Sequence, residues 1–123
     1  MKIRIKGNTI RLRLTKSEVD YFGKFRHIEE KTEFPNATFS YALKQAETNA
    51  LSAEYIENSI HVLIPQVMAE EWIKTEKVGF SGEVKIPGNK ILYLLVEKDF
   101  KCLDETTEDQ SDNYENPLAH LHK

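Results

Sequence analysis

The order hairpin, helix, hairpin occurs twice along the chain, and this repetition restricts the possible folds more than any other feature. Residues 2–6 and 9–14 alternate isoleucine or leucine with lysine or arginine. Such period-two alternation is typical of strands with one buried and one solvated face. Gly7 and Asn8 separate the two segments and favour the tight turn of a hairpin. The sequence therefore predicts that the chain begins with a two-stranded hairpin.

A helix and a second hairpin are predicted next. Ser17 has the residue type of a helix N-cap, and the apolar residues between 18 and 25 have helical spacing. Residues 28–34 and 38–43 are predicted strands, and Pro35-Asn36 forms the turn between them. The first half of the chain is thus a β-β-α-β-β unit.

The same order returns about fifty residues later. Residues 53–56 and 60–64 are predicted strands, and Pro65 suits the first positions of a helix. Residues 78–86 and 91–96 complete the unit around a Pro87-Gly88-Asn89 turn. We expect an internal duplication, although any two amphipathic hairpins share such alternation.

The turn and apolar positions of the two halves align in detail. At a shift of 50 residues Phe22 aligns with Trp72 and Ile28 with Val78. When the shift is increased by two residues, Tyr41 aligns with Tyr93. The aromatic residues are interpreted as core rather than as a ligand pocket. They are Phe22, Phe25, Trp72, Phe80 and Tyr93.

These patterns predict a mainly β fold with two short helices (α+β). Two β-β-α-β-β repeats would form one pseudo-symmetric split β-barrel over residues 1–100, with halves of about 1–50 and 51–100. An extended acidic tail, 101–123, would follow. A chain of 123 residues is long enough to bury one core.

Composition and charge narrow the class of protein. No apolar run approaches the roughly 20 residues that a membrane-spanning helix needs, and a single cysteine allows no internal disulfide. A cytoplasmic location without membrane contact is therefore expected. The net charge of −3 conceals a gradient, because residues 1–50 hold ten Lys/Arg and six Asp/Glu, whereas residues 101–123 hold two and six.

The first half resembles a known superfamily of transcription factors. Residues 2–14 are similar to the opening strand, glycine turn and second strand of the swapped-hairpin superfamily, which contains AbrB, MraZ and the MazE antitoxin. Ile60 to Pro65 resembles the strand that ends in proline, whereas Thr15 stands where the first half would have proline. The resemblance implies two units with interleaved hairpins, and DNA contacts by arginines, here Arg4, Arg11 and Arg13.

The whole chain also looks like a small bacterial family without assigned function. The strand Leu92 to Leu95 and the tail through Asp109 and Asn116 carry this second resemblance. It implies no mechanism.

A basic face on the first hairpin is the most prominent candidate site. Five cations on one ribbon could neutralise several phosphates, and a two-stranded ribbon fits the DNA major groove. The alternative is that these charges are solvated strand residues that discourage edge-to-edge association. The second half favours this alternative, since its equivalent positions are not basic. The candidate nucleic-acid-binding residues are Lys2, Arg4, Lys6, Arg11 and Arg13.

The tail carries two further candidates. Cys102, His120 and His122 are ligand types that zinc prefers, but their spacing fits no standard zinc finger. A free thiol and two solvated histidines are the alternative, and no cofactor other than this zinc is implied. The acidic residues of the tail are candidates for docking a partner. They are Asp104, Glu108, Asp109 and Asp112.

No sequence motif indicates an enzyme, because a phosphate-binding glycine loop and a nucleophile elbow are both missing. We therefore expect a non-catalytic macromolecule-binding module, monomeric or homodimeric, with DNA bound through the basic first hairpin as the specific hypothesis. The alternative is a protein-binding or self-associating module that uses the acidic tail, and a metal site in the tail is the third.

Overall fold

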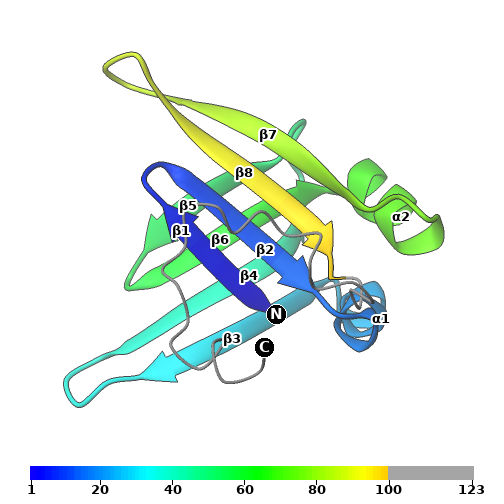
Figure 1. Ribbon diagram of the computed structural model, residues 1–123, viewed down its shortest axis with the longest axis horizontal. Coiled ribbons are helices and arrows are strands. Elements are labelled where there is room, and N and C mark those ends of the chain that lie inside the picture. The colour runs from blue at the N-terminus through cyan, green and yellow to red at the C-terminus, as the bar shows by residue number, and fades with distance from the viewer. Residues whose placement is uncertain (100–123) are drawn as a thin grey trace, which may run out of the picture.

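The computed structural model describes residues 1–99, and in that range the chain forms eight strands and two helices (Figure 1). The elements of the first half are β1 (Lys2–Lys6), β2 (Thr9–Leu14), α1 (Lys16–Phe25), β3 (His27–Glu33) and β4 (Thr38–Ala46). Those of the second half are β5 (Ser52–Ile56), β6 (Ser59–Pro65), α2 (Gln66–Lys74), β7 (Gly79–Ile86) and β8 (Lys90–Lys98). The predicted mainly β fold with two short helices is confirmed.

The strands form two four-stranded sheets, each built from both halves of the chain. Sheet A has the order β1-β2-β8-β7, and sheet B has the order β3-β4-β6-β5. Each sheet therefore joins one hairpin of the first half to one hairpin of the second, through the parallel pairs β2·β8 and β4·β6. Over residues 1–99 the two sheets remain separate, so the expected barrel is not closed.

The core lies between the two sheets, where their inward faces meet. Figure 1 shows sheet A lying across sheet B, with α1 and α2 at the same end of the molecule. At that end Phe22 of α1 packs edge-on against Trp72 of α2, with ring centroids 6.0 Å apart. The strands contribute alternate apolar side chains that are almost completely buried. They include Leu12, Leu14, Leu43, Val62, Ile64, Leu94 and Val96.

Two of the five aromatic residues predicted to be core are largely exposed. Phe25 is 61% exposed and Tyr93 is 44% exposed, whereas Phe22 and Trp72 are fully buried. Phe25 is the last residue of α1 and lies about 120° around the helix from the buried Val19, so it packs on Tyr21 instead.

Tyr93 points outward, although the sequence alignment with Tyr41 predicts that it points inward. That predicted alignment of the two closing hairpins is wrong by one residue. Ile10 and Ile60 are equivalent at the shift of 50 residues. Ile60 pairs with Tyr41, whereas Ile10 pairs with Leu94, so the structural equivalent of Tyr41 is Leu94 and not Tyr93. Because side chains alternate along a strand, a shift of one residue places Tyr93 on the other face from Tyr41. Ile28 and Val78 differ likewise, since Ile28 is buried and Val78 is exposed.

The start of α1 also differs from the prediction. Thr15, rather than Ser17, is the N-cap: its hydroxyl accepts a hydrogen bond from the Glu18 amide, and the Glu18 carboxylate accepts one from the Thr15 amide at 2.8 Å. This reciprocal pair is a capping box. Thr15, which stands where the resemblance would place proline, therefore begins the helix through its side chain.

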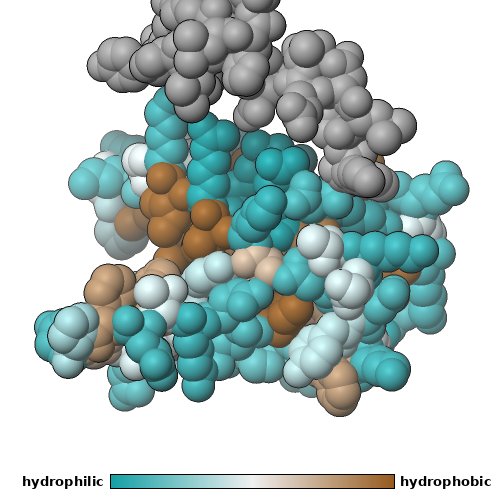
Figure 2. Space-filling view, turned by 60° about the horizontal axis from the view of Figure 1, so that its bottom comes forward, coloured by the Kyte–Doolittle hydropathy of each residue, from teal (hydrophilic) through white to brown (hydrophobic). Residues whose placement is uncertain are grey.

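On the face shown in Figure 2, hydrophilic residues predominate and hydrophobic residues form smaller patches. Within residues 1–99, neither helix has the length and apolar content needed to cross a membrane.

Candidate polyanion-binding face

The structure places the five cations of the first hairpin on one side of sheet A. Lys2 is opposite Arg13 across the β1–β2 ladder, and Arg4 is opposite Arg11. Directly opposed residues on neighbouring strands share a face. The inward positions of β2, Leu12 and Leu14, are fully buried, so the alternate cations must point to solvent. We call this outward set of five residues the basic face.

Acidic residues at the end of β8 neutralise part of the basic face. Glu97 forms an ion pair with Arg11, and Asp99 lies 3.2 Å from the Arg13 guanidinium and 3.6 Å from the Lys2 ammonium. These pairs are partly exposed, so each contributes little to stability. Their main consequence is electrostatic, since three of the five cations have a carboxylate beside them.

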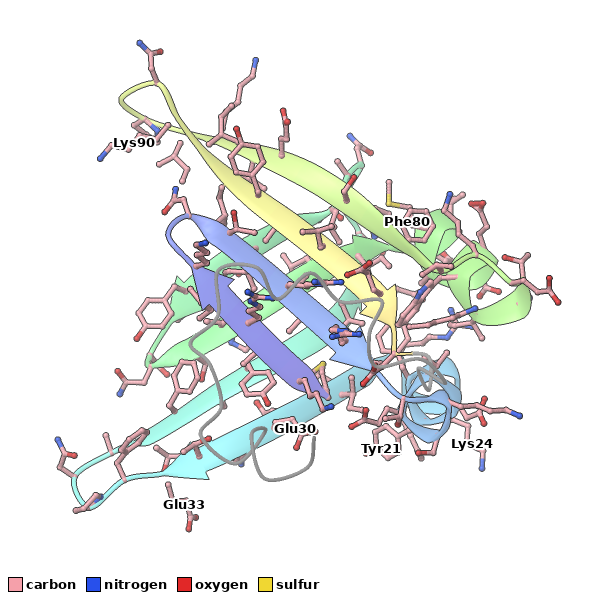
Figure 3. All side chains as sticks on the ribbon, viewed as in Figure 1. Tyr21, Lys24, Glu30, Glu33, Phe80 and Lys90 are labelled. Carbon is pink, nitrogen blue, oxygen red and sulfur yellow. The ribbon has the colours of Figure 1, made fainter. Side chains whose placement is uncertain are left out.

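Arg4 and Lys6 differ from the other three cations. Both are exposed, and over residues 1–99 neither has a carboxylate within ion-pair distance. With Arg11, Thr9 and Leu95 they line a hollow of about 210 Å³ on the outward face of sheet A. Figure 3 shows nitrogen-tipped side chains along β1 and β2 on this side of the sheet. The hollow therefore combines three cations, one hydroxyl and an apolar side chain.

The hairpin that carries these cations is not a free ribbon. β2 lies between β1 and β8, and the hairpin turn is attached to β8 as well. Gly7 adopts the positive φ of the turn, the Asn8 amide group donates to the Ile91 carbonyl at 3.0 Å, and the Tyr93 amide donates to the Asn8 carbonyl. The predicted two-stranded hairpin is therefore present, but it is one half of a four-stranded sheet and not an isolated ribbon.

The equivalent face of the second half is not basic. On β5 and β6, Glu54 is opposite His61 and Ser52 is opposite Leu63. His61 Nδ1 is buried without a hydrogen-bond partner in the structure. The two halves thus present different chemistry at matching positions, as the sequence predicts.

A larger hollow, of about 500 Å³, lies between α1 and β3 and is acidic. Its lining includes Glu18, Glu29 and Glu30, with Tyr21 at its side (Figure 3). The amino group of Met1 forms ion pairs with Glu18 and Glu30. No sequence pattern marks this hollow, because Glu18 of α1 meets the adjacent Glu29 and Glu30 of β3 only in the fold. Within residues 1–99, no cluster of three His, Cys, Asp or Glu side chains has the geometry to hold a metal ion.

The candidate residues of the tail lie outside the described residues. These are the zinc candidates Cys102, His120 and His122 and the docking candidates Asp104, Glu108, Asp109 and Asp112.

The fold and the site together define a two-sheet, mainly β domain with a cationic hollow on one sheet face. Residues 1–118 match the model of a family of unknown function, DUF7009, and the chain belongs to that family. Neither the curated proteins nor the solved structures contain a significant match to the chain.

Proposed function

We propose that this protein is a non-catalytic module that binds a nucleic acid through the basic face of sheet A. The observation that supports this proposal is the pair Arg4 and Lys6, two exposed cations without an acidic neighbour in residues 1–99 that line one hollow with Arg11. Phosphate contacts from such side chains supply most of the sequence-independent affinity of nucleic-acid-binding proteins.

The hollow has the groups that a phosphate diester needs. Its cations provide charge-assisted hydrogen bonds, and the Thr9 hydroxyl adds a neutral donor. Arg11 already pairs with Glu97, so a phosphate at this position would compete with a carboxylate, whereas at Arg4 and Lys6 it would displace only water and counterions. Arg4 and Lys6 are therefore expected to contribute most of the affinity.

Fluorescence anisotropy with a labelled 20-nucleotide oligonucleotide, measured between 50 and 200 mM salt, tests this proposal. The wild-type protein should bind with an affinity that falls steeply with salt. Arg4→Ala and Lys6→Ala should each weaken binding and reduce the slope of log K against log salt by about 1.

Lys31→Ala is the matched control. Lys31 is an exposed lysine on β3 of sheet B and lies 3.9 Å from Glu29, so its removal should leave affinity and salt slope unchanged. Equal losses from Lys31→Ala and Lys6→Ala would contradict a specific site on sheet A, and no binding by the wild type would overturn the proposal.

The arrangement of hairpins supports a relationship to the swapped-hairpin superfamily within this proposal. In both sheets a hairpin of the first half pairs in parallel with a hairpin of the second, as interleaved units would. An internal duplication would account for this order. We propose such an origin for the chain, with a basic face retained in only one of its halves.

A second candidate function is docking of the acidic tail on the basic face. It is favoured by Asp99, the last described residue, which already lies beside Arg13 and Lys2. The tail is thus attached to the domain next to the basic face, and this attachment gives its acidic residues a high effective concentration there. They would then compete with a nucleic acid for the same cations.

Neutral substitutions in the full chain separate the two functions. We expect a variant with Asp104, Asp109 and Asp112 changed to Asn, and Glu108 changed to Gln, to bind the oligonucleotide more tightly at low salt than the wild type. A variant with Glu29, Glu33, Glu54 and Glu57 changed to Gln, which removes the same number of charges from sheet B and its β5–β6 turn, is the control for a general change of net charge. Equal affinity of the tail variant and the wild type would contradict competition by the tail.

A further inference from the structure

We infer that the outward face of sheet A binds single-stranded nucleic acid, with a base stacked on Tyr93; this inference rests on the proposed function and specifies its ligand. The exposed side of β8 carries Tyr93 and Leu95, which are neighbours of Thr9 and Arg11 in the β2–β8 ladder. An aromatic ring and an aliphatic side chain thus stand directly beside the cationic hollow.

The width of sheet A disfavours duplex DNA. Neighbouring strands are about 4.8 Å apart, so the axes of the outermost of four strands are about 14 Å apart. The major groove of B-form DNA is about 12 Å wide and admits a two-stranded ribbon. Because β2 pairs with β8 and the turn at Asn8 is attached to β8, β1 and β2 cannot enter the groove alone. A single strand has no such limit, since it can lie flat on the sheet.

Tyr93 has the exposure that stacking requires. It is 44% exposed, while its neighbours in sequence alternate with it and point into the core, as Leu94 does at 1% exposure. The backbone of Tyr93 is held by its amide, which donates to the Asn8 carbonyl at 2.8 Å. The ring is therefore presented on a fixed inner strand of the sheet. Stacking of a base on it would cost little conformational entropy of the protein.

The neighbouring strand β7 leaves room for bases beyond Tyr93. Opposite Leu95 and Glu97, β7 has Ser81 and Gly79. A side chain at position 79 would collide with the Val96 carbonyl, because an added Cβ would lie 2.1 Å from its oxygen. Small residues next to β8 give this half of the face a low profile, whereas long cationic side chains rise from β1 and β2.

The face therefore has two parallel zones that match the two parts of a single strand. The cations of β1 and β2 would follow the phosphates, and Tyr93 and Leu95 of β8 would receive bases. Stacking on an aromatic ring tolerates any base, so we expect weak sequence preference. Glu83, opposite Tyr93 on β7, would border the base zone.

Anisotropy titrations of the full chain with single-stranded DNA, single-stranded RNA and a duplex of the same sequence test this inference. We expect both single strands to bind more tightly than the duplex. Tyr93→Ala should weaken single-strand binding by about 5- to 150-fold, the effect of losing one stacked base. Tyr93→Phe, which keeps the ring, should bind like the wild type.

Tyr55→Ala is the matched control, because Tyr55 is 67% exposed but belongs to β5 of sheet B, where it lines a hollow between the two sheets and not the outward face of sheet A. Circular dichroism of each variant verifies that it is folded. Equal or tighter binding of the duplex, or no effect of Tyr93→Ala, would overturn the inference. If Lys6→Ala still weakened binding in that case, the proposed phosphate binding would stand. No binding of any of the three nucleic acids would overturn the proposed function itself.

Discussion

Phe22 and Phe25 show how strongly position on one helix determines the role of a residue. Both are phenylalanines of α1, three positions apart, yet Phe22 is fully buried against Trp72 and Phe25 is 61% exposed. Trp72 is the only tryptophan of the chain, and its indole nitrogen donates to the Val78 carbonyl at 3.0 Å. Its fluorescence therefore reports on the packing at this end of the core.

We expect Phe22→Ala to lower the free energy of unfolding by about 3–5 kcal/mol, because it removes a large buried side chain and leaves a cavity. Phe25→Ala should change it by less than about 0.5 kcal/mol. Urea titrations followed by the fluorescence of Trp72 measure both values. Similar losses from the two substitutions would contradict the packing of α1 described here.

Tyr41 makes the stability depend on pH in alkaline solution. Burial of its ring, and to a lesser extent the nearby Glu30 carboxylate, raises the pKa of the Tyr41 hydroxyl above its ordinary value of 10.0. The hydroxyl also donates to the Met1 carbonyl at 2.8 Å. Because the folded protein holds this proton more tightly than the unfolded chain, the stabilisation is complete below pH 10. It is lost as the pH rises from 10 through the raised pKa.

We therefore expect the urea midpoint of the wild type to fall more steeply than that of Tyr41→Phe as the pH rises above 10. The variant lacks the titrating group, so the difference between the two curves isolates Tyr41 from other groups that titrate in this range. Parallel curves would show that the Tyr41 hydroxyl has the same pKa in both states.

At the scale of single elements, the N-cap of α1 is where the structure and the sequence-based prediction differ. The sequence predicts Ser17 as the N-cap, whereas the structure places Thr15 there in a capping box with Glu18. We expect Thr15→Ala to destabilise the protein by about 1 kcal/mol and Ser17→Ala to have a much smaller effect. Thermal melts by circular dichroism measure the difference, and the reverse order would restore Ser17 as the cap.

Strands were easier to predict than the exact register between them. Period-two alternation identifies each strand and its two faces, because a half-buried strand requires it. The register of β8 against β2 depends on which residues of the other half meet it, and the sequence alignment of Tyr41 with Tyr93 was wrong by one position. That single residue decides that Tyr93 faces solvent.

At the scale of the whole molecule, interleaving makes each half depend on the other. A β-β-α-β-β half contributes one hairpin to each sheet and has no complete sheet of its own. Isolated two-stranded hairpins are marginally stable at best. The buried Phe22–Trp72 contact also joins the two halves.

Fragments divided in the segment between β4 and β5 test this dependence. Residues 1–49 and 50–123, prepared as separate peptides, should each lack a cooperative thermal transition, and an equimolar mixture should recover one. Circular dichroism and the fluorescence of Trp72 follow the recovery. A cooperative transition in either fragment alone would mean that one half folds by itself.

The sequence by itself determined the elements, their order and the outward direction of the five cations, because alternation and turn residues are local properties of the chain. Only the tertiary structure decided which strands pair. It joined β2 to β8, placed Glu97 and Asp99 beside three of the cations, and left Arg4 and Lys6 next to Leu95. The physical reason is that parallel pairing of β2 with β8 joins residues about 84 positions apart, and no local pattern encodes such a contact.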